Sequence, residues 1–145
     1  MRAVVQRVSS ASVSVDGAVR GSCGRGLVVL LGIARGDDAG TAERLASKAA
    51  RLRVFEGADG RLDRSLADVG GEALVVSQFT LLADTRKGTR PSFSAAAPAD
   101  EAEPLYERFC GALEGERIAV ARGAFGARME VSLVNDGPVT IILDA

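Results

Sequence analysis

Alternating and continuous apolar stretches along the chain predict β-strands. Between residues 12 and 19, valines alternate with polar residues, and the alternation is interrupted by Asp16-Gly17, a dipeptide typical of a tight hairpin turn. Residues 26–33 form an apolar run bounded by glycines, which favours a strand covered on both faces. Further strands are expected at residues 3–8, 73–79, 129–134 and 139–143, which makes at least six in all.

Two segments with helical periodicity interrupt the strands. Apolar residues recur every three or four positions over residues 41–52 and predict a helix with one buried stripe. In the second segment Asp100 and Glu103 match a capping pair, which places Pro104 in the tolerant first turn. Gly115 marks the expected end of this helix. Its expected buried face comprises Ala102, Leu105, Tyr106, Phe109 and Leu113.

Chain length and composition bound the architecture. With 145 residues, of which 47% are hydrophobic and 26% charged, the chain has the size and composition of one folded domain. No internal repeat, linker or low-complexity segment divides it. We therefore predict a single domain over residues 1–145, of the α+β class, with a mainly antiparallel, barrel-like sheet and two main helices.

The absence of histidine restricts the chemistry that the chain can perform. Ser-His-Asp and Cys-His catalysis are excluded, as is any histidine-ligated metal site. The two cysteines lack metal-site spacing; we expect Cys110 to be packed on the second helix and Cys23 to lie in a turn. The glycine-rich residues 21–26 lack the spacing of a dinucleotide site. We therefore expect no metal and no cofactor.

Net charge and hydropathy limit the partners. A formal net charge of −1 argues against broad, non-specific binding of nucleic acid, although a local basic patch is compatible with it. No apolar run approaches the roughly 20 residues that span a bilayer, and residues 1–10 lack a signal-peptide core. We expect a cytoplasmic protein without membrane contact.

Three polar segments are candidates for function, and each also has a purely structural interpretation. Residues 77–80 follow an apolar strand, either as groups at the rim of a pocket or as a strand that frays into a loop. Arg86, Lys87 and Arg90 lie around a glycine and a proline, unpaired by neighbouring acids, as in a solvated loop or a phosphate site. Residues 135–140 fit a hairpin turn between the last two strands. Only about 5–6% of X-Pro bonds in folded proteins are cis, so the sequence leaves the isomer open.

Taken together, these segments resemble the D-aminoacyl-tRNA deacylase family over essentially the whole chain. Ser77–Leu81 (SQFTL) combined with Asn135–Thr140 (NDGPVT) carries most of the resemblance, because each motif alone is weak and the combination is specific. The other matching segments are Gln6–Val8, Leu62-Asp63, Asp68–Gly71, Arg90–Phe93 and Gly123–Ala127. The resemblance implies the fold of these deacylases and hydrolysis of the ester bond of D-aminoacyl-tRNA.

The resemblance further implies a homodimer in which Gly137-Pro138 of one subunit enters the active site of the other, with a cis peptide bond. The Gly137 carbonyl would capture the α-amino group of the substrate, and Arg7 would hold the Gly-Pro turn in place. The backbone N–H groups of Phe79 and Thr80 would bind the ester carbonyl. The remaining implied residues are Ser77 and Gln78 on the catalytic side and Ala102, Phe125 and Met129 on the substrate side, with Ala102 beside the adenosine.

Selection between D and L substrates also follows from the geometry of the substrate's α-carbon. If the amino and carbonyl groups are fixed, the two enantiomers exchange side chain and hydrogen. A rigid backbone placed where the side chain of the L enantiomer would lie excludes the L form and accepts varied D side chains. Glycine has no side chain that could collide with this backbone, so we expect glycyl-tRNA to be cleaved as well. The ester is already activated, so positioned donors and an oriented water suffice. Thr80 is either the nucleophile or, as we prefer, a positioning residue, because nothing in the sequence would deprotonate it.

Three other functions fit parts of the same pattern. A related tRNA-editing fold with a trans Gly-Pro bond would tolerate L-alanine. A non-catalytic RNA-binding module would use Arg86, Lys87 and Arg90 and would bind tRNA in a salt-dependent way without deacylation. The aromatic content of only 4% argues against a base-stacking surface. A small-molecule esterase would cleave free amino-acid esters as readily as aminoacyl-tRNA.

Overall fold

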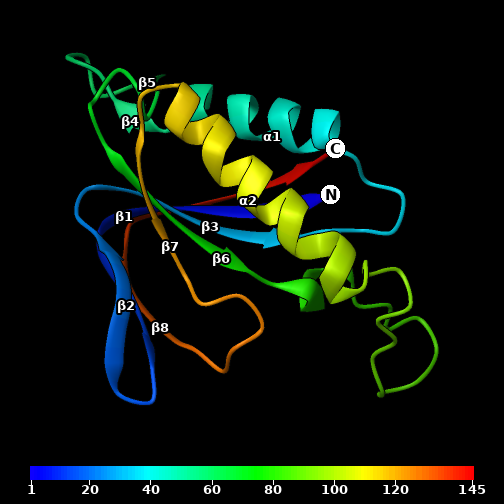
Figure 1. The fold of residues 1–145 in the computed structure, drawn as a ribbon. Helices are drawn as coiled ribbons and strands as arrows, with labels where there is room; N and C mark the ends of the chain where they lie inside the picture. Colours follow the sequence, from blue (N-terminus) through cyan, green and yellow to red (C-terminus); the bar gives the residue numbers. More distant parts are fainter.

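The computed structural model describes residues 1–145 and places most of its strands in one sheet. The strands of this sheet are β1 (Arg2–Val15), β2 (Ala18–Cys23), β3 (Gly26–Gly32), β6 (Glu72–Ser77), β7 (Ala119–Arg122) and β8 (Glu130–Asp144). Their order is β2-β1-β3-β6-β7, and β8 pairs with β1 (Figure 1). Two shorter strands, β4 (Phe55–Glu56) and β5 (Leu62–Arg64), pair only with each other.

The main sheet is mixed in direction. β1 pairs antiparallel with β2, β3 and β8, whereas the β3–β6 and β6–β7 pairs are parallel. Helix α1 (Ala39–Arg51) lies between β3 and β6 in the chain, and α2 (Ala99–Gly115) lies between β6 and β7. Both helices cover the same face of the sheet (Figure 1). The predicted α+β class with two main helices is confirmed. The parallel strand pairs were not predicted from the sequence, because hydrophobic periodicity does not specify strand direction.

The sheet curves until its two edges meet. Gly21 of β2 lies so close to β7 that a Cβ atom at this position would stand 2.5 Å from the carbonyl oxygen of Arg122. Only glycine allows this approach of two backbones. The sheet is therefore nearly closed into a barrel, as the sequence predicted.

β1 is one long strand where two short ones were expected. Its first half, Arg2–Val8, pairs with β3, and its second half, Ala11–Val15, pairs with β2. β8 follows the opposite edge of β1 along almost its whole length. The predicted Asp16-Gly17 turn is confirmed, and both residues have the positive φ angles, 50° and 78°, that such a turn requires.

The last strand corrects the prediction of a hairpin at residues 135–138. β8 runs from Glu130 to Asp144, and both of its halves pair with β1, so no turn reverses the chain. The register shifts twice opposite this segment, between Gln6 and Val8 and between Val8 and Ser10. Proline has no N–H for a ladder, which is tolerated because the outer edge of β8 pairs with no other strand. Gly137-Pro138 is therefore an irregularity within an edge strand.

α1 forms as the periodicity predicts. The carboxylate of Asp38 accepts a hydrogen bond from the N–H of Thr41 at 2.7 Å and caps the first turn. The residues of the predicted apolar stripe are buried, apart from the half-buried Leu52 at the end: Ala42, Leu45, Ala46 and Ala49. This stripe lies on the core between the helices and the sheet.

α2 begins earlier than its polar residues suggested. The predicted capping pair of Asp100 and Glu103 is wrong, because the helix starts at Ala99 and no side chain caps it. The carbonyl of Pro98 instead accepts the N–H groups of Glu101 and Ala102. Pro104 consequently lies inside the helix and not in its first turn, on the exposed side. The predicted end at Gly115 is confirmed.

Apolar side chains are buried on both faces of the sheet. The larger core lies under α1 and α2 and contains Leu27, Val29 and Leu31 of β3, whereas Val28 belongs to a smaller core on the other face. This confirms the expectation that residues 26–33 are covered on both sides. Cys110 is packed in the larger core as expected, but Cys23 ends β2 in the smaller core and does not lie in a turn. No helix has the length and apolar character needed to cross a membrane.

Phe109 provides a test of the helix packing. Its side chain is fully buried between α2 and the sheet, so Phe109→Ala should lower the free energy of unfolding by about 3–5 kcal/mol through lost burial and a cavity. Chemical denaturation at one protein concentration measures the change. Glu103→Ala, on the exposed face of the same helix, should change stability by less than about 0.5 kcal/mol. An unchanged midpoint for Phe109→Ala would show that α2 presents another face to the core.

Candidate active site

The polar residues after β6 form an ordered turn. β6 ends at Ser77, and the N–H of Gln78 donates to the carbonyl of Leu31 in β3 at 2.8 Å. The chain then enters a 3₁₀ helix, η1 (Phe79–Leu82), so the interpretation of this segment as a fraying strand is wrong. The hydrogen bonds of the turn are donated by the N–H groups of Leu81 and Ala83.

The start of η1 offers backbone donors to a ligand. The first N–H groups of a helix have no partner inside it, and this applies to Phe79 and Thr80. Both residues are exposed, so their N–H groups do not need to be satisfied within the protein. Two neighbouring N–H groups at a helix start can stabilise negative charge on an oxygen atom.

A cleft lies on both sides of this turn. One part, of about 250 Å³, is lined mainly by apolar residues, among them Phe79, Ala97, Ala102 and Phe125. The other, of about 230 Å³, shares Ser77, Phe79 and Gly126 with the first and adds Gln78 and Met129. The structure thus brings together six of the residues singled out in the sequence: Ser77, Gln78, Phe79, Ala102, Phe125 and Met129.

Thr80 lies beside this cleft without lining it. Its hydroxyl oxygen accepts a hydrogen bond from the side-chain amide of Gln78, and this is the only side-chain partner of that hydroxyl. The amide cannot remove a proton, since it donates here. The hydroxyl hydrogen of Thr80 is therefore free to donate to a bound molecule.

Tyr106 supports the cleft from behind and was not predicted as a site residue. Its ring lies 5.8 Å from that of Phe125, measured between centroids, and its hydroxyl donates to the carbonyl of Val75 at 2.8 Å. Burial raises the pKa of Tyr106, so the hydroxyl stays a neutral donor. Burial also raises the pKa of the neighbouring Cys110 to about 12, which leaves this thiol unsuited as a nucleophile.

Arg7 holds the segment before Gly137 from the inside of the protein. Its Nε donates to the carbonyl of Asp136 at 3.1 Å and lies 3.3 Å from the Asp136 carboxylate, while Nη1 donates to the carbonyl of Val54 at 2.7 Å. The Arg7 side chain is buried, whereas Gly137 and Pro138 are exposed. The Gly137-Pro138 peptide bond is cis.

Asn135 spans the same irregularity, and the sequence placed it in the NDGPVT motif without assigning it a role of its own. Its Oδ1 accepts the N–H of Val139 at 3.3 Å, and its Nδ2 donates to the hydroxyl of Thr140 at 3.0 Å. The Thr140 hydroxyl also accepts a hydrogen bond from the side chain of Gln6 on β1. Gly137 has φ of +124°, a conformation that favours glycine. In the sequence, the polar residues on both sides of the Gly-Pro pair were the available signal for these side-chain hydrogen bonds.

The candidate residues fall into two groups within one chain. The residues around Ser77 line the cleft, whereas Gly137 and Pro138 line no part of it. Arg7 contributes to a different cavity of about 140 Å³, whose lining also includes Arg25, Phe55, Glu56 and Asp136.

One expectation is wrong in the loop between Asp84 and Ser92 (the basic loop), which contains Arg86, Lys87 and Arg90. The guanidinium of Arg86 donates two hydrogen bonds to the carboxylate of Asp84 and the backbone N–H of Arg86 donates a third, so Arg86 is paired by a neighbouring acid, and these bonds lower the pKa of Asp84. Lys87 and Arg90 are exposed and form no ion pair. The signal was present, because Asp84 stands two residues before Arg86.

A family model described as D-Tyr-tRNA(Tyr) deacylase matches residues 4–144. The chain belongs to this family. A D-aminoacyl-tRNA deacylase of Roseiflexus castenholzii is 62% identical over 145 residues, which cover 100% of this chain and 92% of the relative. One of Anaeromyxobacter dehalogenans is 61% identical and covers 100% and 97%.

Solved structures share the same fold. One, described as c-Myc DNA Unwinding Element Binding Protein, superimposes with a TM-score of 0.93 at 43% identity and covers 100% of this chain and 99% of the other. Another, described as a probable eukaryotic D-amino acid tRNA deacylase, has a TM-score of 0.82 at 18% identity and covers 99% and 98%.

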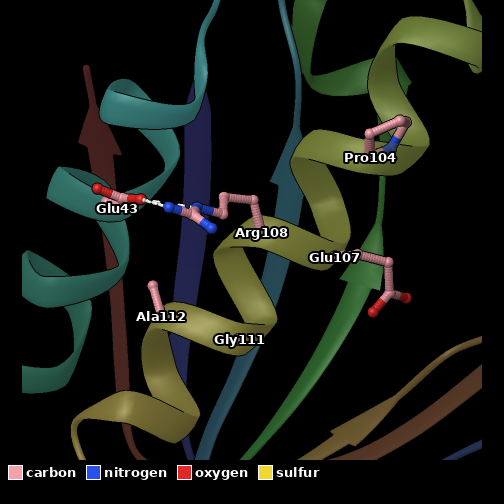
Figure 2. Close-up of a pocket in the computed structure, with 6 residues that line it drawn as sticks. All are labelled: Glu43, Pro104, Glu107, Arg108, Gly111 and Ala112. Carbon is pink, nitrogen blue, oxygen red and sulfur yellow. Dashed lines mark hydrogen bonds and ion pairs between the residues drawn. The ribbon is translucent and has the colours of Figure 1, made fainter.

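The largest surface depression of this family member lies away from the cleft. It measures about 540 Å³ and lies against α1 and α2, with Glu43 and Arg108 paired across it (Figure 2). Glu107 on its rim is paired with Arg122. Its other lining residues are Pro104, Gly111 and Ala112. With its charges already paired and almost no apolar lining, this depression offers a ligand little. No cluster of acidic or cysteine residues is arranged to hold a metal ion.

Proposed function

We propose that this protein hydrolyses the ester bond of D-aminoacyl-tRNA and releases the free D-amino acid and tRNA. The observation that carries the proposal is the cleft at the end of β6, where two backbone N–H groups lie beside apolar walls in a chain 62% identical to a D-aminoacyl-tRNA deacylase. In this proposal residues 1–145 form one catalytic domain that needs no cofactor and removes D-amino acids from tRNA during translation quality control.

The reaction requires little more than positioning. Water adds to the ester carbonyl, the oxygen becomes negatively charged, and the N–H groups of Phe79 and Thr80 donate to it. The C–O bond to the ribose then breaks, and the proton lost by the water ends on the ribose oxygen. The 2′-hydroxyl of the terminal adenosine is placed to relay this proton. Loss of one hydrogen-bond donor to such an oxygen costs about 3 kcal/mol of transition-state stabilisation in other enzymes.

Gly137-Pro138 of the partner subunit supplies stereochemical selection in this proposal. The carbonyl of Gly137 accepts a hydrogen bond from the α-amino group of the substrate. The contacts of Arg7 with Asp136 hold the segment before Gly137 rigid. The L side chain would collide with this backbone, whereas the D side chain points toward solvent. Ala102 borders the adenosine, and Phe125 and Met129 complete the apolar walls.

A homodimer is proposed because each chain is incomplete alone. Gly137 and Pro138 are exposed and do not line their own cleft, so in this proposal a second chain brings them there. They lie on the free outer edge of β8, a strand with 15 residues that also exposes Val131, Val134 and Ile142. A long, apolar edge strand is a typical surface for association. We also propose that the protein acts in the cytoplasm, where aminoacyl-tRNA is used.

Matched D- and L-tyrosyl-tRNA test the activity. We expect the purified protein to release D-tyrosine at least about 100-fold faster than L-tyrosine, since every ~1.4 kcal/mol of steric clash is a factor of ten. Glycyl-tRNA should also be cleaved. Equal rates for both enantiomers would contradict the proposal, and release of D-alanine without release of glycine would contradict rejection by backbone alone. Release of L-alanine would favour the related editing fold, and cleavage of free amino-acid esters at the same rate a general esterase.

Thr80→Ala distinguishes positioning from covalent catalysis. Because the hydroxyl is hydrogen-bonded only to an amide, we expect kcat to fall by roughly tenfold or less, whereas loss of a true nucleophile costs on the order of 10⁶-fold. Single-turnover rates with D-tyrosyl-tRNA measure the effect. If Thr80→Ala still binds substrate but does not turn over, while Thr80→Ser remains active, Thr80 is the nucleophile.

Mixed dimers test the shared site. Gly137→Ala should disturb the Gly137-Pro138 segment, since a Cβ atom at residue 137 would stand 3.0 Å from both Arg7 and Val139. Ala102→Leu should fill the cleft. Dimers with Gly137→Ala in one subunit and Ala102→Leu in the other can be purified through two different tags. In such a dimer one site combines an unaltered cleft with an unaltered Gly137-Pro138 segment from the partner. The mixed dimer should therefore show about half the activity of the unaltered dimer. Each variant alone should be inactive yet folded, as judged by thermal unfolding. Mixed dimers without activity would contradict a shared site.

A further inference from the structure

Two phenylalanines stand exposed at the edge of the cleft. Phe79 is 55% exposed and Phe93 38% exposed, and their rings meet edge to face with centroids 5.2 Å apart. Phe55 and Phe109, by contrast, are fully buried. Rings that remain in water contribute little to folding, and exposed aromatic side chains grouped beside a cleft are typical of ligand-binding surfaces.

Phe93 has a defined position at the base of the basic loop. Asp84 and Ser92 exchange two backbone hydrogen bonds, of 2.8 and 2.9 Å, that close the loop between them. The carbonyl of Phe93 accepts the N–H of Ala96 at 3.0 Å, and the next residue, Ala97, lines the cleft. The ring is thus held beside η1, while the loop itself extends past the N-terminal end of α2 (Figure 1).

Cations without an ion pair lie close to Phe93 in the chain or contact the residue next to it. Lys87 and Arg90 form no ion pair, and the Nε of Arg35 donates to the carbonyl of Ser94, next to Phe93, at 3.0 Å while its guanidinium stays exposed. Arg86 is the exception, because Asp84 pairs with it. An exposed aromatic ring flanked by cations is the combination that binds single-stranded nucleic acid, in which a base stacks on the ring and phosphates lie near the cations.

The position of the ring selects the part of the substrate that it meets. Under the proposed function, the cleft holds the aminoacyl group and the terminal adenosine of tRNA. Phe79 lines this cleft, and the ring of Phe93, which is not part of the lining, contacts the ring of Phe79. The next part of the substrate along the chain is the unpaired pair of cytidines in the CCA end that all tRNAs share.

We propose that Phe93 stacks on a base of these cytidines and that Lys87, Arg90 and Arg35 bind the adjoining phosphates. This inference rests on the proposed function and extends it to the nucleotides before the terminal adenosine. Stacking does not depend on base identity, and the CCA end is common to all tRNAs, so the contact suits an enzyme that acts on many tRNAs. The low aromatic content argued against a stacking surface, but one correctly placed ring is enough.

Two esters that differ only in these nucleotides provide the test: D-tyrosyl-adenosine and the D-tyrosyl ester of the trinucleotide CCA. The unaltered protein should show a roughly tenfold lower KM for the trinucleotide ester. Phe93→Leu keeps an apolar side chain but has no aromatic face, and it should reduce this preference to the part supplied by the cations without changing kcat or the KM for D-tyrosyl-adenosine. Phe93→Tyr should restore it.

The alternative outcomes are separable. If Phe93→Leu impairs both esters equally, the ring acts only by bracing Phe79, and the inference is overturned. It is also overturned if the unaltered protein cleaves both esters with the same KM. If the unaltered protein cleaves neither these esters nor D-tyrosyl-tRNA, the proposed function itself fails.

The cations have their own test. The KM for the trinucleotide ester should rise with salt concentration, and the double variant Lys87→Ala/Arg90→Ala should weaken that dependence. Arg20→Ala is the matched control, because Arg20 is also exposed and forms no ion pair but lies on β2, outside the segment 84–92 and the cleft lining. An unchanged salt dependence in the double variant would remove these cations from the binding surface.

Discussion

Backbone pairing along β1 holds the molecule together and determines where both groups of site residues lie. One edge of this strand pairs with β3 and then β2, and the other edge pairs with β8. β3 in turn positions β6, so that Gln78 is fixed to Leu31 where the sheet ends and the cleft begins. The same strand carries Arg7, which reaches Asp136 beside the irregularity in β8. Cleft and Gly-Pro segment are therefore held by one continuous ladder.

In the proposed function, the chemistry of the site follows from rigidity and not from reactive side chains. The chain has no histidine, and the buried thiol of Cys110 has its pKa raised to about 12. What remains are backbone donors at the start of η1 and side chains that keep the walls in place. Tyr106 contacts Phe125 and donates to β6, and Asn135 spans the cis bond in β8. Such groups suit the hydrolysis of an activated ester, in which orientation supplies most of the rate.

Much of the fold could be predicted from local patterns, and the failures share one cause. Residues 26–33, the Asp16-Gly17 turn and α1 were identified correctly because periodicity and turn chemistry act over few residues. The hairpin at residues 135–138 was wrong because a strand with an irregularity and two strands with a turn have the same local pattern. The capping pattern of Asp100 and Glu103 likewise fits more than one helix start, and the helix begins earlier, at Ala99, with no side-chain cap.

For the site, the sequence by itself determined which segments matter: residues 77–80, the basic loop and residues 135–140. It also determined the absence of histidine, and with it the absence of Ser-His-Asp and Cys-His catalysis, because composition excludes these directly. Tertiary structure decided that the first and last of these segments lie apart within one chain, that Phe93 contacts Phe79 and Tyr106 contacts Phe125, and that the side chain of Asn135 bonds Val139 and Thr140. Contacts between residues distant in sequence depend on strand direction and on the curvature of the sheet, and neither leaves a periodic signal in the chain.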